Sequence, residues 1–80
     1  MHKTRVSDRQ ICVDCIQFFT DILPKEDDSL SLYCKDDLDL IEIVLECEKE
    51  LCIHVDCDWI KFTQFTTVKD FIDFILSFKH

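Results

Sequence analysis

The sequence predicts an all-α fold, with four helices in a single domain. Three stretches of apolar residues with helical spacing each follow a helix-start signal, namely two capping boxes and one aspartate N-cap. The chain has 80 residues, one proline and no glycine, so no flexible linker composition divides it. We therefore expect residues 1–80 to form one domain, with three long helices, one short helix and a long first loop around a small core.

The first predicted helix covers residues 7–22. Ser7 and Gln10 form a capping box, and apolar positions then recur with helical spacing. The positions expected to face the core are Ile11, Cys15, Phe18 and Ile22. Pro24 disfavours helical geometry in the residue before it, and a polar first loop then runs toward Lys35.

The second predicted helix runs from Asp37 to Leu51. Asp36 is a good N-cap, because its carboxylate can accept hydrogen bonds from the first backbone amides of the helix. Asp37 and Asp39 add negative charge at the end where the helix dipole favours it. The residues expected to point inward are Ile43, Cys47 and Leu51.

A short third helix is expected after residue 55, where Asp56 or Asp58 would serve as its cap. Its large apolar residues are Trp59, Ile60 and Phe62. We expect these aromatic and aliphatic side chains to belong to the core.

The fourth predicted helix starts at a second capping box, formed by Thr67 and Asp70. It is expected to end in Lys79 and His80. Its apolar stripe consists of Phe71, Ile72, Ile75 and Phe78.

The order of these elements, together with several short motifs, resembles acyl carrier proteins. Residues 36–44 read Asp-Asp-Leu-Asp-Leu-Ile-Glu-Ile-Val and are similar to the family's Asp-Ser-Leu helix start, while Thr66-Thr67-Val68 resembles the start of its fourth helix. The resemblance covers most of the chain and implies a mostly antiparallel four-helix bundle. In the family, 4′-phosphopantetheine esterifies the serine and carries acyl or aminoacyl groups between enzymes, as in fatty acid or polyketide biosynthesis.

Asp37 occupies the position of that serine. A carboxylate forms at best a labile mixed anhydride with a phosphoryl group, so we expect no phosphopantetheine at Asp37 and no other cofactor. The resemblance then implies a non-enzymatic interaction module without catalytic residues. One alternative is a functional carrier, either because Asp37 is an altered serine or because Ser29, in a literal Asp-Ser-Leu, is the attachment site. A helix from Ser29 to Leu51 would, however, be too long for the family.

The formal net charge of −8 excludes nucleic acid as an expected partner, because phosphate binding needs clustered Lys and Arg. The resemblance implies instead that the second helix docks on a basic surface of a biosynthetic enzyme or transferase. The residues expected to bind this partner are Asp36, Asp37, Leu38, Ile41, Glu42, Leu45, Glu46 and Glu48. Alternatively, Ile41 and Leu45 widen the core stripe and the acids only face water.

Six cysteines raise a second alternative, a small zinc-binding helical domain. Cys12 and Cys15 have the spacing of a zinc pair, but they fall inside a predicted helix, where a zinc knuckle needs a turn. Cys52, His54 and Cys57 form a looser cluster. We expect no metal site and reduced cysteines that act mostly as small apolar residues.

The apolar runs are far shorter than the ~20 residues that a membrane span needs. No N-terminal leader with a charged segment followed by an apolar one is present. We therefore expect a cytoplasmic monomer with no membrane partner.

Overall fold

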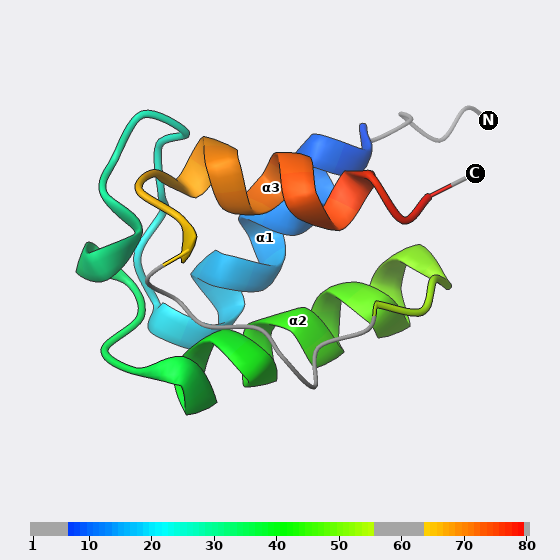
Figure 1. The fold of residues 1–80 in the computed structure, drawn as a ribbon, viewed down its shortest axis with the longest axis horizontal. Helices are drawn as coiled ribbons and strands as arrows, with labels where there is room; N and C mark the ends of the chain where they lie inside the picture. Colours follow the sequence, from blue (N-terminus) through cyan, green and yellow to red (C-terminus); the bar gives the residue numbers. More distant parts are fainter. Residues whose placement is uncertain (1–6, 56–63, 80) are drawn as a thin grey trace, which may run out of the picture.

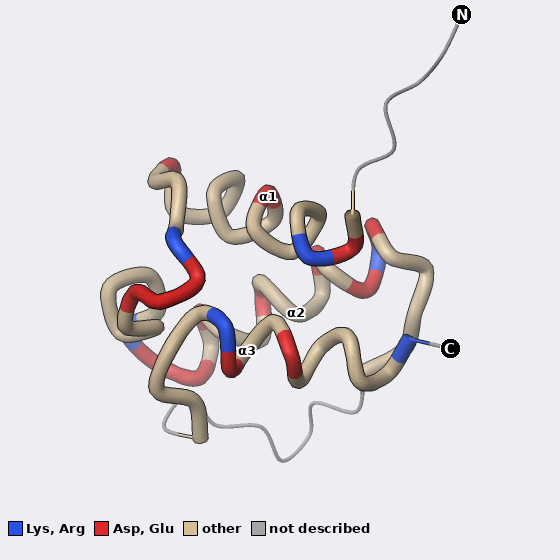
Figure 2. The backbone as a smooth tube through the Cα atoms, turned by 90° about the horizontal axis from the view of Figure 1, so that it is seen from above, with Lys and Arg blue, Asp and Glu red and all other residues tan. Residues whose placement is uncertain are grey.

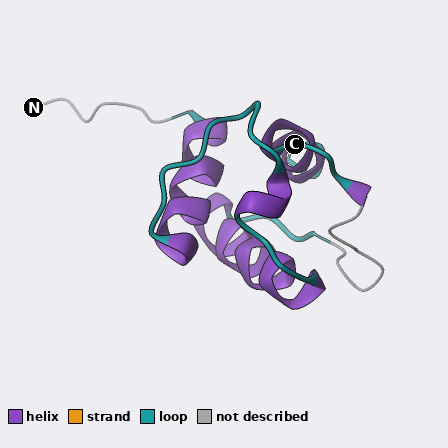
Figure 3. Cartoon of the chain, turned by 90° about the vertical axis from the view of Figure 1, so that its left-hand side faces the viewer, coloured by secondary structure: helices purple, strands orange, loops and turns teal. Residues whose placement is uncertain are grey.

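The computed structural model describes residues 7–55 and 64–79, and over these ranges the protein is all-α (Figure 1). Its helices are α1 (Asp8–Thr20), the 3-10 helix η1 (Leu30–Leu32), α2 (Asp37–Leu51) and α3 (Val68–Leu76). α1 packs against both α2 and α3. The described ranges contain no strand beyond one isolated bridge (Figure 3). The short helix predicted after Asp56 or Asp58 lies outside the described residues.

α1 buries part of the predicted stripe: Cys15 is buried and Ile11 is partly buried against the core, as predicted. Phe18 is 79% exposed and Ile22, which lies beyond the end of the helix, is 52% exposed, so these two assignments to the core were wrong. The buried residues of α1 are Cys12, Val13, Cys15 and Ile16. The capping box is half formed: the Ser7 hydroxyl accepts from Gln10 N at 3.1 Å, whereas the Gln10 side chain donates to Asp14 instead. The helix ends at Thr20 because Asp21 adopts a left-handed conformation, with φ 65°.

α3 begins as predicted and ends earlier. The Thr67 hydroxyl accepts from Asp70 N at 3.1 Å, and the Asp70 carboxylate accepts from Thr67 N at 3.2 Å, which completes the capping box. Phe71, Ile72 and Ile75 are buried, while Phe78 is partly buried beyond the helix. The predicted end at Lys79 and His80 was wrong. The helix stops at Leu76, after which the chain continues in tighter i→i−3 turns: Phe78 N donates to Ile75 O and Lys79 N donates to Leu76 O, both at 3.1 Å.

The first loop contributes to the core and is tied to the start of α3. Leu30, Tyr33 and Cys34 are buried, so this polar segment is not simply a solvated connection. Three backbone hydrogen bonds join it to α3: Leu30 N to Thr66 O at 3.0 Å, Val68 N to Asp28 O at 2.9 Å, and Lys69 N to Glu26 O at 2.8 Å. Figure 1 shows the loop and the start of α3 side by side. These bonds gather the loop, the end of α1 and the starts of α2 and α3 at one end of the molecule.

Arg9 connects three segments near the beginning of α1. Its guanidinium forms hydrogen bonds with both oxygens of Glu26 in the first loop and, at 2.7 Å, with Asp73 Oδ1 on α3. These bonds lower the pKa of both carboxyl groups and raise that of Arg9. At the same end, Asp8 Oδ2 lies 3.6 Å from Lys79 Nζ, so the beginning of α1 and the end of the described chain are close together (Figure 1).

No helix in the described ranges combines the length and apolarity that crossing a bilayer requires.

Candidate docking surface on α2

The start of α2 is held by the side chains of two aspartates, Asp36 and Asp39. Asp36 is the N-cap, and its Oδ1 accepts from Asp39 N at 3.0 Å. Asp39 Oδ2 in turn accepts from Lys35 N at 2.9 Å. Asp37 is the first helical residue and is partly exposed, so the predicted cap and the predicted bounds of this helix are both confirmed. The carboxylate of Asp37 therefore stands where the helix dipole favours negative charge.

The outer face of α2, which we define as Leu38, Glu42 and Leu45, points away from the core. Leu38 is 69% exposed and Leu45 is 53% exposed, with the exposed carboxylate of Glu42 between them. The opposite side of the helix is buried and consists of Leu40, Ile43, Val44, Cys47 and Leu51. Ile41 lies at the border, partly buried against the core. The helix thus presents large apolar side chains and acid to solvent on one side (Figure 2 shows the charged positions).

Glu48 lies on a flank of α2 and interacts with the chain itself. Its Oε2 accepts from Val55 N at 2.5 Å and is 3.6 Å from His54 Nδ1, and the side chain is only 16% exposed. Helix propagation stops just before these contacts, where Cys52 has φ 55°. Glu48 therefore closes the end of α2 and is less available to a partner than Glu42.

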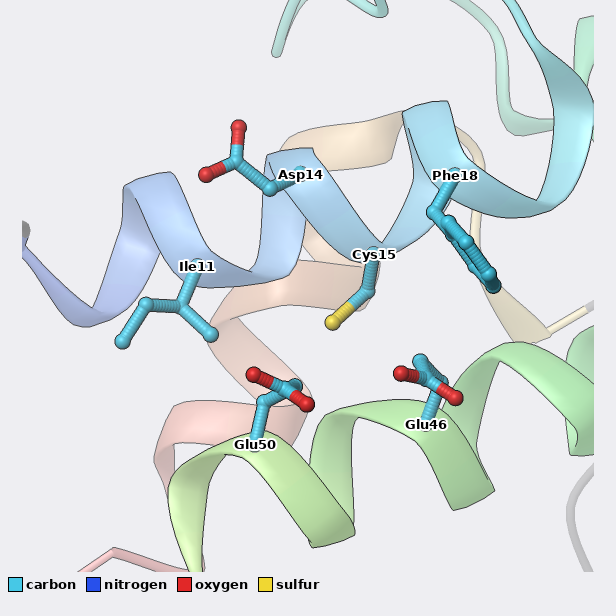
Figure 4. Close-up of a pocket in the computed structure, with 6 residues that line it drawn as sticks. All are labelled: Ile11, Asp14, Cys15, Phe18, Glu46 and Glu50. Atoms are coloured by element: carbon cyan, nitrogen blue, oxygen red, sulfur yellow. The ribbon is translucent and has the colours of Figure 1, made fainter.

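Glu46 lies on the other flank, toward α1. Its carboxylate is 3.7 Å from Lys49 Nζ, and the side chain is 28% exposed. Figure 4 shows it facing the gap between α1 and α2. The eight residues predicted to bind a partner thus divide between the cap, the outer face and the two flanks.

A pocket that the sequence analysis did not identify lies beside the start of α2. It has a volume of about 360 Å³ and is bordered by the end of α1, by the η1 segment and by Lys35 and Asp39. Its apolar lining includes Phe19, Ile22 and Leu32. The sequence carries a signal for it, since the consecutive apolar pairs at 18–19 and 22–23 exceed what one helical stripe can bury.

Ser29 is not at the start of α2. It precedes η1, its Oγ lies 2.8 Å from Ser31 Oγ, and its backbone pairs with Thr67 in the isolated bridge. The literal Asp-Ser-Leu motif therefore forms part of the contact between the first loop and α3.

The cysteines of the two helices meet at their interface. Cys12 and Cys15 on α1 and Cys47 on α2 are all buried, and Cys52 is exposed. The described cysteines are free thiols, and no group of three His, Cys, Asp or Glu side chains within 7–55 and 64–79 is arranged to hold a metal ion. Cys57, part of the looser cluster, lies outside these ranges.

Comparison of the chain with protein-family models found no match, and comparisons with curated proteins and with solved structures found none either.

Proposed function

We propose that this protein is an acyl-carrier-like, non-enzymatic interaction module that has lost phosphopantetheine attachment and docks through α2 on a basic surface of an acyl-assembly enzyme or transferase. The proposal includes the finer architecture, a four-helix bundle of the carrier type. The observation that carries it is the start of α2, where Asp37 is the first helical residue behind the Asp36 cap. The helix that follows has Leu38, Glu42 and Leu45 exposed on its outer face.

The group at position 37 does not fit covalent phosphopantetheine. A stable phosphodiester needs a hydroxyl, and Asp37 offers a carboxylate at the helix N-terminus. The proposed activity is therefore binding without covalent cargo. Exposed apolar side chains beside acids suit a basic partner with apolar contacts, since charge steers the encounter and the leucines supply buried area.

Restoration of the hydroxyl tests the carrier-like surface. The Asp37→Ser variant, incubated with coenzyme A and a broad-specificity phosphopantetheinyl transferase, is expected to gain one phosphopantetheine, because the surrounding helix start is intact. The unmodified protein is expected to gain none. Intact-mass spectrometry measures both outcomes, and circular dichroism verifies that the variant is folded.

Two further variants in the Asp37→Ser background test whether the outer face binds the transferase. Glu42→Lys should slow modification several-fold, because it reverses a charge on the docking face. Asp27→Lys makes the same change at an exposed position of the first loop and should leave the rate nearly unchanged. A folded Asp37→Ser protein that stays unmodified, or a wild-type protein modified at Ser29, would refute the proposal.

A further inference from the structure

Three thiols form a cluster in the interface between α1 and α2. Cys12, Cys15 and Cys47 have exposed fractions of 0%, 3% and 0%. The thiol of Cys47 interacts with those of Cys12 and Cys15, and all three side chains belong to the same core cluster. The cluster was not predicted, because the sequence places Cys47 far from the other two.

Cys15 differs from the other two cysteines because it also borders a pocket. This pocket has a volume of about 390 Å³ and opens between the two helices. Figure 4 shows the Cys15 sulfur pointing into the gap between α1 and α2. Ile11 and Phe18 supply apolar walls from α1. Neither Cys12 nor Cys47 lines the pocket, so Cys15 is the member of the cluster that a small reagent reaches first.

Two carboxylates, those of Glu46 and Glu50 on α2, lie beside the Cys15 sulfur (Figure 4). Asp14 on α1 also borders the pocket, but its carboxylate points away from the gap. Negative charge at these positions repels anionic reagents and does not oppose neutral ones. The pocket therefore selects among thiol reagents by charge.

Interactions between the thiols give Cys15 and Cys47 different acidities. The interaction with Cys47 lowers the pKa of Cys15, although burial and the neighbouring acids Glu46, Glu50 and Asp14 oppose this effect. The interactions with Cys12 and Cys15, together with burial, raise the pKa of Cys47. Cys15 is therefore the first of this pair to lose its proton, and the thiolate is the nucleophilic form of cysteine.

We propose that Cys15 is a site of reversible oxidation by small neutral hydroperoxides, and that Cys47 resolves the oxidised form to an α1–α2 disulfide. The contact between the two thiols and the pocket beside Cys15 carry this proposal, which is independent of the docking function.

The reaction is a two-electron oxidation of two thiols. The Cys15 thiolate attacks one peroxide oxygen, an S–O bond forms, the O–O bond breaks, and the leaving hydroxide (or alkoxide) takes up a proton. The sulfur of Cys47 then attacks the sulfenic sulfur of Cys15. The S–S bond forms, the S–O bond breaks, and water leaves with the proton of the Cys47 thiol. With hydrogen peroxide as oxidant, the products are one disulfide and two waters.

Peptide mapping tests this assignment on the full chain. The reduced protein is treated with hydrogen peroxide, its remaining thiols are blocked with N-ethylmaleimide, and it is digested with trypsin without reduction. Cleavage after Lys and Arg separates residues 10–25, which contain both α1 cysteines, from residues 36–49, which contain Cys47 alone. The expected product joins these two peptides, and dithiothreitol should separate them again.

Single replacements identify the partner of Cys47. The joined product should persist in Cys12→Ala and disappear in Cys15→Ala, with circular dichroism confirming that each variant is folded. A joined product that persists in folded Cys15→Ala would overturn the assignment. A wild-type protein whose exposed Cys52 is fully oxidised while 10–25 and 36–49 remain unjoined would also overturn it.

Reagent charge gives a second measurement that needs no cysteine replacement. The measured quantity is the rate of modification at Cys15 divided by the rate at Cys52. This ratio should be higher with neutral 4,4′-dithiodipyridine than with Ellman's reagent, which is a dianion. In the double variant Glu46→Gln and Glu50→Gln, the difference between the two ratios should be several-fold smaller. No change in the double variant would overturn the proposed selection by charge.

Discussion

At the scale of single residues, the absence of glycine has a structural effect at the ends of α1 and α2. Asp21 and Cys52 both occupy the left-handed region that glycine adopts without steric cost, with φ values of 65° and 55°. A side chain with a Cβ atom is strained there by about 1–2 kcal/mol. Aspartate tolerates this region because its short polar side chain can hydrogen-bond locally, so Cys52 is the position whose strain a single replacement can release.

Replacement of Cys52 measures this strain. Cys52→Gly is expected to be more stable than Cys52→Ala by roughly 1 kcal/mol, because only glycine removes the Cβ atom. Both variants lose the long contact of the thiol with Lys49 O, which makes alanine a matched control. Urea unfolding provides the measurement. Equal midpoints for the two variants would show that the left-handed conformation costs little here.

At the scale of elements, α2 was predicted with correct bounds because its signals are local. The Asp36 cap, the acids of the first turn and the apolar spacing all lie within the helix or next to it. For α1, the helical spacing correctly predicted that Ile11 and Cys15 face the core, but it also placed the exposed Phe18 on that side. Burial depends on which neighbours pack against a helix, and that information is not local to α1.

The cap of α2 can be tested by removing its acceptor. Asp36→Ala should destabilise the protein by about 1 kcal/mol, because Asp39 N then loses its partner. Asp36→Asn keeps an oxygen in the same place and should cost much less. Thermal or urea unfolding compares the two variants. A cost for asparagine as large as that for alanine would mean that the charge, rather than the hydrogen bond, stabilises the helix start.

The candidate site was also predictable only in part. Leu38, Glu42 and Leu45 follow from the helical register, and the structure leaves all three exposed. The self-contact of Glu48 with Val55 and the pocket between α1 and η1 depend on how the loops return to the helices. Such contacts lie partly in irregular segments and have no periodic signal, although the surplus of apolar residues at 18–19 and 22–23 does point to the pocket.

At the scale of the whole molecule, Arg9 links α1, the first loop and α3 by hydrogen bonds to Glu26 and Asp73. The side chains of these three residues are 36%, 38% and 45% exposed, so solvent screens the network and its contribution is small. The direction in which its contribution changes with pH is nevertheless defined by the pKa shifts. Lowered carboxyl pKa values mean that the stabilisation is complete above the unfolded-state pKa and is lost as the pH falls through the folded-state values.

The Arg9→Met variant isolates this contribution, because it keeps an apolar stem and removes the charge. Wild type should be the more stable protein at pH 7, and the difference should shrink as the pH falls below about 4. Urea unfolding at several pH values gives the comparison, in which the repulsion among the other acids largely cancels. A difference that stays constant down to pH 2 would show that Arg9 contributes through packing alone.

The close approach of Asp8 to Lys79 bears on how this protein can be immobilised. The chain enters and leaves the described fold at one end, whereas the Asp36 cap and the neighbouring pocket lie at the other (Figure 1). A tag, a linker or a solid support added before residue 7 or after residue 79 therefore joins the described fold at the end opposite the cap. Immobilised protein therefore presents the beginning of α2 outward, in the orientation that a binding measurement needs.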